Sequence, residues 1–87
     1  MTDNELLMKV KQGLAITGDY QDSTLKIYID EVKQFLINAG VKRSVVESDR
    51  SVGCILIGVN DLWNYSVGDI KFSDYFNKRV IQLSAEE

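Results

Sequence analysis

The sequence has no histidine and a single cysteine, Cys54, so it lacks the side chains on which many catalytic and metal sites depend. A serine–histidine–aspartate triad and a thiol–imidazole pair both need a histidine as base, and a thiolate zinc site needs several cysteines. One cysteine cannot form a disulfide within the chain, which is typical of proteins that work in a reducing compartment. Its apolar neighbours indicate that Cys54 is a small core residue. We therefore expect no enzyme activity, and no residue pattern supports a small enzyme as an alternative.

Positive charge is scarce as well. The chain has 10 lysine and arginine residues against 13 aspartate and glutamate residues, which gives a net charge of −3. Such a molecule as a whole repels the phosphates of nucleic acids. The two basic pairs, Lys42-Arg43 and Lys78-Arg79, are not interleaved with aromatic side chains as in a groove for single-stranded nucleic acid. The charge pattern therefore predicts solvated basic pairs rather than ordinary DNA binding.

The glycine and carboxylate patterns predict no cofactor and no metal ion. Gly13 and Gly18 are followed by Asp19, whereas a phosphate-binding loop continues with lysine and then serine or threonine. Asp30-Glu31 and Glu86-Glu87 are adjacent carboxylates, and neighbours in a helix point to different faces, so they cannot share a proton or a metal ion. We expect no catalytic, cofactor-binding or metal-binding residues.

The chain has no proline and no long apolar run. Its most apolar segment, residues 52–59, is too short to span a bilayer, and no positively charged segment precedes a signal-like stretch. An apolar content of 45% with 26% charged residues is ordinary for a folded soluble domain. Because 87 residues allow one small core, the sequence predicts a single domain over residues 1–87, with no membrane contact and no export.

Apolar residues recur at helical spacing in four segments, at about residues 3–13, 22–39, 48–64 and 73–85. This pattern predicts a compact all-α bundle of about four helices with an extended loop over residues 65–72. Candidate N-terminal caps precede each segment, namely Thr2 with Glu5 in capping-box spacing, Asp22 or Ser23, Ser48 or Asp49, and Ser73. Two breakers, Gly13 and Gly18, end the first helix, and Gly40 ends the second.

The third predicted helix is the most informative, because it is apolar on more than one side. One stripe of its helical wheel comprises Val52, Ile55, Leu56, Val59, Leu62 and Trp63. Cys54 and Ile57 lie on the far side of that stripe. Gly53 and Gly58 each cost about 1 kcal/mol relative to alanine, a cost usually tolerated where another backbone approaches closely. Cover for this helix can come from the other three helices or from a neighbouring subunit.

Two other helices have a clearer apolar face. In the second, the buried stripe is predicted to comprise Leu25, Tyr28, Ile29, Val32, Phe35, Leu36 and Ala39. In the last, one face is predicted to comprise Tyr75, Phe76, Arg79, Val80 and Leu83. Ile27 and Ile37 lie off the stripe of the second helix, which makes them candidates for a subunit contact, although single exposed isoleucines are common.

Several blocks of the sequence, in their order and spacing, resemble a known family. The segment 61–65, a short glycine-containing loop and the segment 71–83 look like the C-terminal half of the small head-tail connector proteins of long-tailed phages and prophages. The segment 7–17 before an acidic loop, and the segment 28–35 followed by Ala39-Gly-Val41, are similar to the first half of these proteins. The resemblance covers nearly the whole chain.

This resemblance implies an all-α ring, usually about twelve-fold, that binds beneath the portal protein in the virion neck after synthesis in the host cytoplasm. The ring would present a second surface to the stopper or tail-completion protein, with DNA only as cargo in its channel. A heterologous ring buries two different faces of each subunit, and an acidic channel would not hold passing DNA. The chain departs from the family where Tyr65-Ser-Val replaces an arginine after the third helix. Besides the two isoleucines, the predicted subunit or portal contacts are Trp63, Tyr65, Val67, Ile70, Phe72 and Tyr75.

Trp63 also fits a role in the core, since it lies on the main stripe of its helix. The alternative function is a small helical regulatory or DNA-binding protein in which the second and third helices form a helix-turn-helix. Against this alternative, the would-be recognition helix carries Arg50 and no further lysine or arginine through Tyr65.

Overall fold

Each long helix begins and ends close to the residues that the sequence predicts. The computed structural model describes residues 2–64 and 73–85, and within these ranges the chain forms helices and no strand. The helices are α1 (Asp3–Gly13), α2 (Asp22–Asn38), α3 (Arg43–Val46), α4 (Val52–Asn64) and α5 (Asp74–Ser84), and a short 3₁₀ helix, η1 (Asp49–Ser51), leads into α4. The predicted all-α class is confirmed, whereas the predicted loop 65–72 lies outside the described residues.

Hydroxyl side chains cap three helix starts. Thr2 Oγ1 accepts a hydrogen bond from the Glu5 backbone amide at 3.1 Å and lies 3.2 Å from the Glu5 carboxylate, to which the hydroxyl donates. Ser73 Oγ accepts from the Phe76 amide at 3.2 Å, and Ser48 caps η1. A cap of this kind is worth about 1 kcal/mol. These predicted caps are confirmed.

The predicted cap of the second helix is wrong. Gln21 occupies the cap position of α2 and makes no side-chain hydrogen bond there, while Asp22 is the first helical residue and Ser23 follows it. The reason is a competing partner, because the Asp22 carboxylate binds Lys11 Nζ at 2.8 Å. The hydrogen bond that the Lys11 ammonium donates to the Asp22 carboxylate raises the pKa of Lys11, and the nearby Asp19 carboxylate acts in the same direction. The negative charge of Asp22 in the first turn also stabilises the helix through its favourable interaction with the helix dipole.

The end of α2 shows why Gly40 is a stop signal. Gly40 has φ +100°, a left-handed conformation that glycine adopts without a Cβ clash. Its amide donates to the Ile37 carbonyl at 3.1 Å, and the Val41 amide donates to the Leu36 carbonyl at 3.0 Å. This pair of bonds is a Schellman motif, and Leu36 and Val41 are both buried beside it.

Helix α1 ends in the same motif, but not at a glycine. Ala15 takes the left-handed conformation with φ +57°, and its amide donates to the Gln12 carbonyl while the Ile16 amide donates to Lys11. Gly13 instead remains helical, and a Cβ there would lie 2.5 Å from the nearest Leu56 side-chain atom. The glycine therefore serves close packing against α4 rather than chain reversal.

Helix α3 is the element that sequence periodicity missed. Its four residues lie in the segment expected to be a loop. Val45 and Val46 are nonetheless buried, as is Val41 before them. A single helical turn is too short to show a repeat, so the burial of these valines had no sequence signal.

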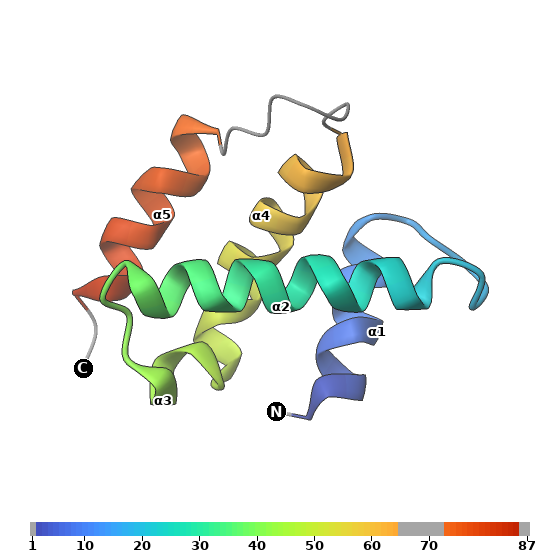
Figure 1. Ribbon diagram of the computed structural model, residues 1–87, viewed down its shortest axis with the longest axis horizontal. Coiled ribbons are helices and arrows are strands. Elements are labelled where there is room, and N and C mark those ends of the chain that lie inside the picture. Colours follow the sequence, from blue (N-terminus) through green and yellow to red (C-terminus); the bar gives the residue numbers. More distant parts are fainter. Residues whose placement is uncertain (1, 65–72, 86–87) are drawn as a thin grey trace.

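Helix α4 lies at the centre of the bundle. It packs against α2, α1 and α5, and Figure 1 shows α2 crossing it, with α5 and α1 on either side. The molecule measures 36 × 30 × 17 Å. Its core draws on every helix and comprises Leu6, Leu7, Val10, Leu25, Ile29, Val32, Leu36, Val41, Val45, Val46, Cys54, Ile55, Val59, Leu62, Phe76, Val80 and Leu83.

The buried face of α4 differs from the predicted stripe. Val52, Leu56 and Trp63 are only half-buried, whereas the buried positions are Cys54, Ile55, Gly58, Val59 and Leu62. The small residues explain this rotation, because they allow neighbouring helices to approach. A Cβ on Gly58 would lie 2.6 Å from Phe76 Cε1 and 2.9 Å from Val32 Cγ1. The chain therefore covers the buried side of α4 with its own helices α2 and α5.

Candidate functional site

The described residues include no cluster suited to a metal ion, and their one thiol is buried. Among residues 2–64 and 73–85, no group of three or more histidine, cysteine, aspartate or glutamate side chains could hold a metal ion. Burial raises the pKa of the Cys54 thiol to about 11, with the charge of Arg79 opposing the shift. A fully buried, protonated thiol is inert toward nucleophilic chemistry. No helix in these ranges combines the length and apolar character needed to cross a membrane.

Two predicted contact residues lie on the outside of the bundle. The Ile27 side chain is 65% exposed on α2, and the Tyr75 side chain is 62% exposed on α5. For Tyr75 this corrects the predicted apolar face of the last helix. The buried residues of α5 are Phe76, Val80 and Leu83, and Tyr75 is one helical step of about 100° from Phe76, which turns its ring outward.

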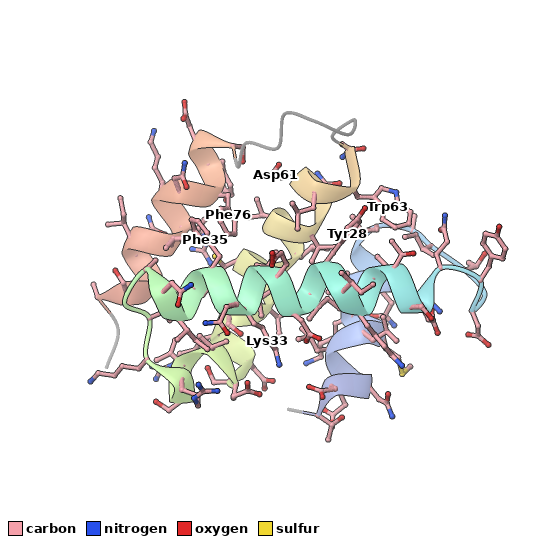
Figure 2. All side chains as sticks on the ribbon, viewed as in Figure 1. Tyr28, Lys33, Phe35, Asp61, Trp63 and Phe76 are labelled. Atoms are coloured by element: carbon pink, nitrogen blue, oxygen red, sulfur yellow. The ribbon has the colours of Figure 1, made fainter. Side chains whose placement is uncertain are left out.

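Two others pack against the core. Ile37 and Trp63 are half-buried, and the Trp63 ring meets the Tyr28 ring edge-on, with centroids 6.0 Å apart and an interplanar angle of 82°. Figure 2 shows this pair joining α4 to α2, and a second pair, Phe35 and Phe76, joining α2 to α5. Trp63 therefore packs against the core of its own chain, as its position on the main stripe predicts. The remaining candidates, Tyr65, Val67, Ile70 and Phe72, lie outside the described residues.

Sequence reasoning missed three large exposed apolar side chains. They are Met8 at 62%, Tyr20 at 96% and Ile81 at 68% exposure. The signal for Ile81 was available, because residues 75, 78 and 81 all lie away from the buried positions 76, 80 and 83 on a helical wheel. Helix α5 therefore presents two apolar side chains, Tyr75 and Ile81, with the exposed Lys78 between them.

The outward side of α2 has a different character. Ile27 stands there beside Asp30 and Glu31, three and four residues on, and both carboxylates are exposed. Within the described part of the chain, neither carboxylate forms an ion pair. Lys33 on the same helix is occupied, because its ammonium lies 3.4 Å from both the Asp3 and the Glu47 carboxylates. The outward side of α2 is thus an apolar side chain flanked by unpaired negative charge.

Two polar links fix the helices that carry these surfaces. Lys33 ties α2 to the start of α1 and the end of α3, and its side chain is only 14% exposed. At the other side of the bundle, Asp61 Oδ2 accepts hydrogen bonds from the Ser73 amide at 3.0 Å and from the Ser73 hydroxyl at 2.8 Å. This carboxylate positions the first turn of α5 against the end of α4 (Figure 2).

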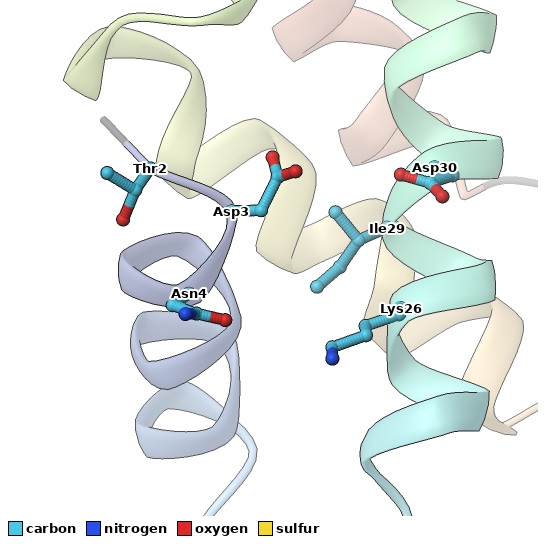
Figure 3. Close-up of a pocket in the computed structure, with 6 residues that line it drawn as sticks. All are labelled: Thr2, Asp3, Asn4, Lys26, Ile29 and Asp30. Atoms are coloured by element: carbon cyan, nitrogen blue, oxygen red, sulfur yellow. The ribbon is translucent and has the colours of Figure 1, made fainter.

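The hollows on the described surface are shallow. The groove in Figure 3 has a volume of about 400 Å³ and lies between the start of α1 and the first half of α2. It is lined by Thr2, Asp3, Asn4, Lys26, Ile29 and Asp30. A small-molecule site is usually an enclosed, largely apolar pocket, and this open polar groove lacks those features.

Comparisons of the chain with protein-family models, with curated proteins and with solved structures found no match.

Proposed function

We propose that this protein is a structural head-tail connector of a phage or prophage, which assembles as a ring beneath the portal protein and works without catalysis. The observation that carries the proposal is the contrast between a core closed within one chain and apolar side chains displayed on two separate outer surfaces. Ile27 occupies the outward side of α2, and Tyr75 and Ile81 occupy α5. The resemblance of the sequence blocks to small head-tail connectors supports the same function.

A ring explains why both surfaces are needed. In a cyclic assembly with heterologous contacts, each subunit presents one surface to the next copy and a different surface to the previous one. Burying an isoleucine or aromatic side chain contributes about 1.5 to 3 kcal/mol, so a few such residues give a contact that is weak alone and strengthened by ring closure or by a portal template. The net charge of −3 suits a channel through which DNA passes without being held.

The alternative DNA-binding function has less support. A helix-turn-helix protein inserts its recognition helix into the major groove with base-contacting side chains outward. Here α4 is enclosed by α1, α2 and α5, and its exposed positions are Gly53, Asn60 and Asn64. None of these side chains can neutralise a phosphate.

Size-exclusion chromatography with light scattering tests the proposal, on the protein alone and mixed with the portal protein of the same phage or prophage. We expect the mass of the mixed species to exceed that of the portal by several copies of this chain, and electron microscopy to show a ring below the portal. Salt-sensitive, sequence-selective retardation of duplex DNA at physiological salt, with no portal binding, would establish the regulatory alternative instead.

A further inference from the structure

We infer that copies of this chain contact one another head to tail, with α5 of one copy lying against the outward side of α2 in the next. The first surface, the α5 ridge, comprises Tyr75, Lys78 and Ile81. The second, the α2 face, comprises Ile27, Asp30 and Glu31. This inference deepens the proposed function and rests on it only for the closure of the copies into a ring.

The α2 face is an apolar centre with negative flanks. Ile27 points directly away from the buried positions Leu25 and Ile29, and its side chain is 65% exposed. Asp30 and Glu31 lie one turn further along, on either side of its axis. The neighbouring cation on this helix, Lys26, lines the groove toward α1, and so does Asp30. Glu31 is therefore the carboxylate of this face that lies outside that groove. The face therefore favours a partner that brings an apolar side chain together with a positive charge.

The α5 ridge supplies that combination. Tyr75 and Ile81 are 62% and 68% exposed, and the exposed Lys78 lies between them along the helix. Lys78 forms no ion pair with any described residue. Asp74 is also exposed on this helix, but it lies in the first turn of α5. The positive end of the helix dipole stabilises its negative charge there.

Charge also decides the direction of the contact. A symmetric contact of two α5 ridges would bring the Lys78 ammonium groups together, and a symmetric contact of two α2 faces would oppose Asp30 and Glu31 to themselves. Only the mixed contact pairs Lys78 with Glu31 or Asp30. In Figure 1, α2 crosses the molecule and α5 lies at one end of it, and the residues of both surfaces are exposed, so neither surface covers the other within one copy. The contact therefore propagates from copy to copy.

Cysteine cross-linking tests this arrangement, because the native thiol of Cys54 is wholly buried and stays out of the reaction. The variant Glu31→Cys/Lys78→Cys, oxidised at high protein concentration, should give a ladder of dimers, trimers and larger species on a non-reducing gel. Each single variant should remain monomeric, and an equal mixture of the two single variants should stop at dimers. The control pair Glu31→Cys/Met8→Cys replaces an exposed methionine on α1, outside the proposed contact, and should give no ladder.

Charge reversal provides a test without cysteines. Lys78→Glu and Glu31→Lys should each weaken self-association several-fold in sedimentation velocity, and the double variant should recover it, because opposite charges again meet across the contact. Lys42→Glu, which removes an exposed lysine away from both surfaces, is the matched control and should leave self-association unchanged.

Three results would overturn the inference: no ladder from the Glu31→Cys/Lys78→Cys variant, an equal ladder from the control pair, or efficient dimers from either single variant. The outcomes also separate the contact from the proposed function. A ladder without portal binding would leave the contact standing and remove the connector role. Rings on the portal without a ladder would leave the role standing and remove this contact.

Discussion

Helices α4 and α5 use their apolar residues in opposite ways. The 13 residues of α4 include no basic residue and are mostly apolar. Most of these apolar side chains pack against α1, α2 and α5 instead of facing solvent. The 11 residues of α5 are far more polar, yet they expose Tyr75 and Ile81. The apolar content of a helix therefore did not predict which one exposes large apolar side chains. The direction of each side chain relative to the core decided it.

Among the substitutions that test this contrast between α4 and α5, we expect the largest effect at Gly58, where α4 packs closely against α2 and α5. Gly58→Leu places a branched side chain where a Cβ alone already lies 2.6 Å from Phe76 and 2.9 Å from Val32. We expect a loss of about 3 kcal/mol or more in the free energy of unfolding, which exceeds the roughly 1 kcal/mol gained in helix propensity. The thermal midpoint of the monomer, followed by circular dichroism, should fall by more than about 10 °C.

Gly53→Ala is the matched control for that variant within the same helix. A Cβ at Gly53 meets only an Arg79 side-chain atom at 3.8 Å, so the substitution should raise the midpoint through helix propensity. An unchanged midpoint in Gly58→Leu, together with lost self-association, would instead place the close contact of α4 between subunits.

The buried thiol predicts a loss of stability at high pH. Burial raises the pKa of Cys54 from 9.0 to about 11, so the unfolded chain releases this proton before the folded chain does. This contribution to the free energy of unfolding is fully present below pH 9 and is lost as pH rises through 11, by about 2 to 3 kcal/mol. The raised pKa of Lys11 acts in the same direction at higher pH. Denaturant unfolding at several pH values should give a flatter dependence for Cys54→Ala, and an equal slope in both proteins would contradict the assignment.

Much of the fold followed from the sequence, and the misses have identifiable causes. Caps such as Ser73 and the stop at Gly40 are local signals, so the helix ranges were predictable. The chain reversal at Ala15 was not, since alanine carries no signal for a left-handed conformation. The orientation of α4 also escaped prediction, because the close approach at Gly58 depends on two other helices. Among the exposed apolar residues, Ile27 was recognisable from its position off the stripe of its helix, and Ile81 was recognisable in the same way from its position off the predicted face of the last helix.

The Schellman motifs at the ends of α1 and α2 allow a paired test in which the expected change in stability is smaller. Ala15→Gly should stabilise the protein by about 0.5 to 1 kcal/mol, because glycine adopts the left-handed conformation without the Cβ clash. Gly40→Ala, at the equivalent position after α2, should lose about 1 kcal/mol or more for the reverse reason. Denaturant midpoints of the two variants check both signs, and a loss in Ala15→Gly would show that residue 15 is not strained.

The smallest expected effect on stability is at Ile81. Because its side chain is 68% exposed, Ile81→Ser should change the free energy of unfolding by less than about 0.5 kcal/mol while weakening self-association. Met8→Ser is the control, since Met8 is similarly exposed on α1 and lies outside the proposed contact. Equal loss of self-association in both variants would indicate a nonspecific apolar effect.

Hydrogen exchange of the free and assembled protein, read by mass spectrometry, tests most directly the claim that the chain closes its core alone and assembles through its outer surfaces. Our account predicts that assembly, at high concentration or on the portal, slows exchange in α5 and in the first half of α2. Exchange in α4 should stay as slow as in the free protein, because that helix is already enclosed. Assembly that protects mainly α4, or a chain that remains monomeric under both conditions, would contradict the account.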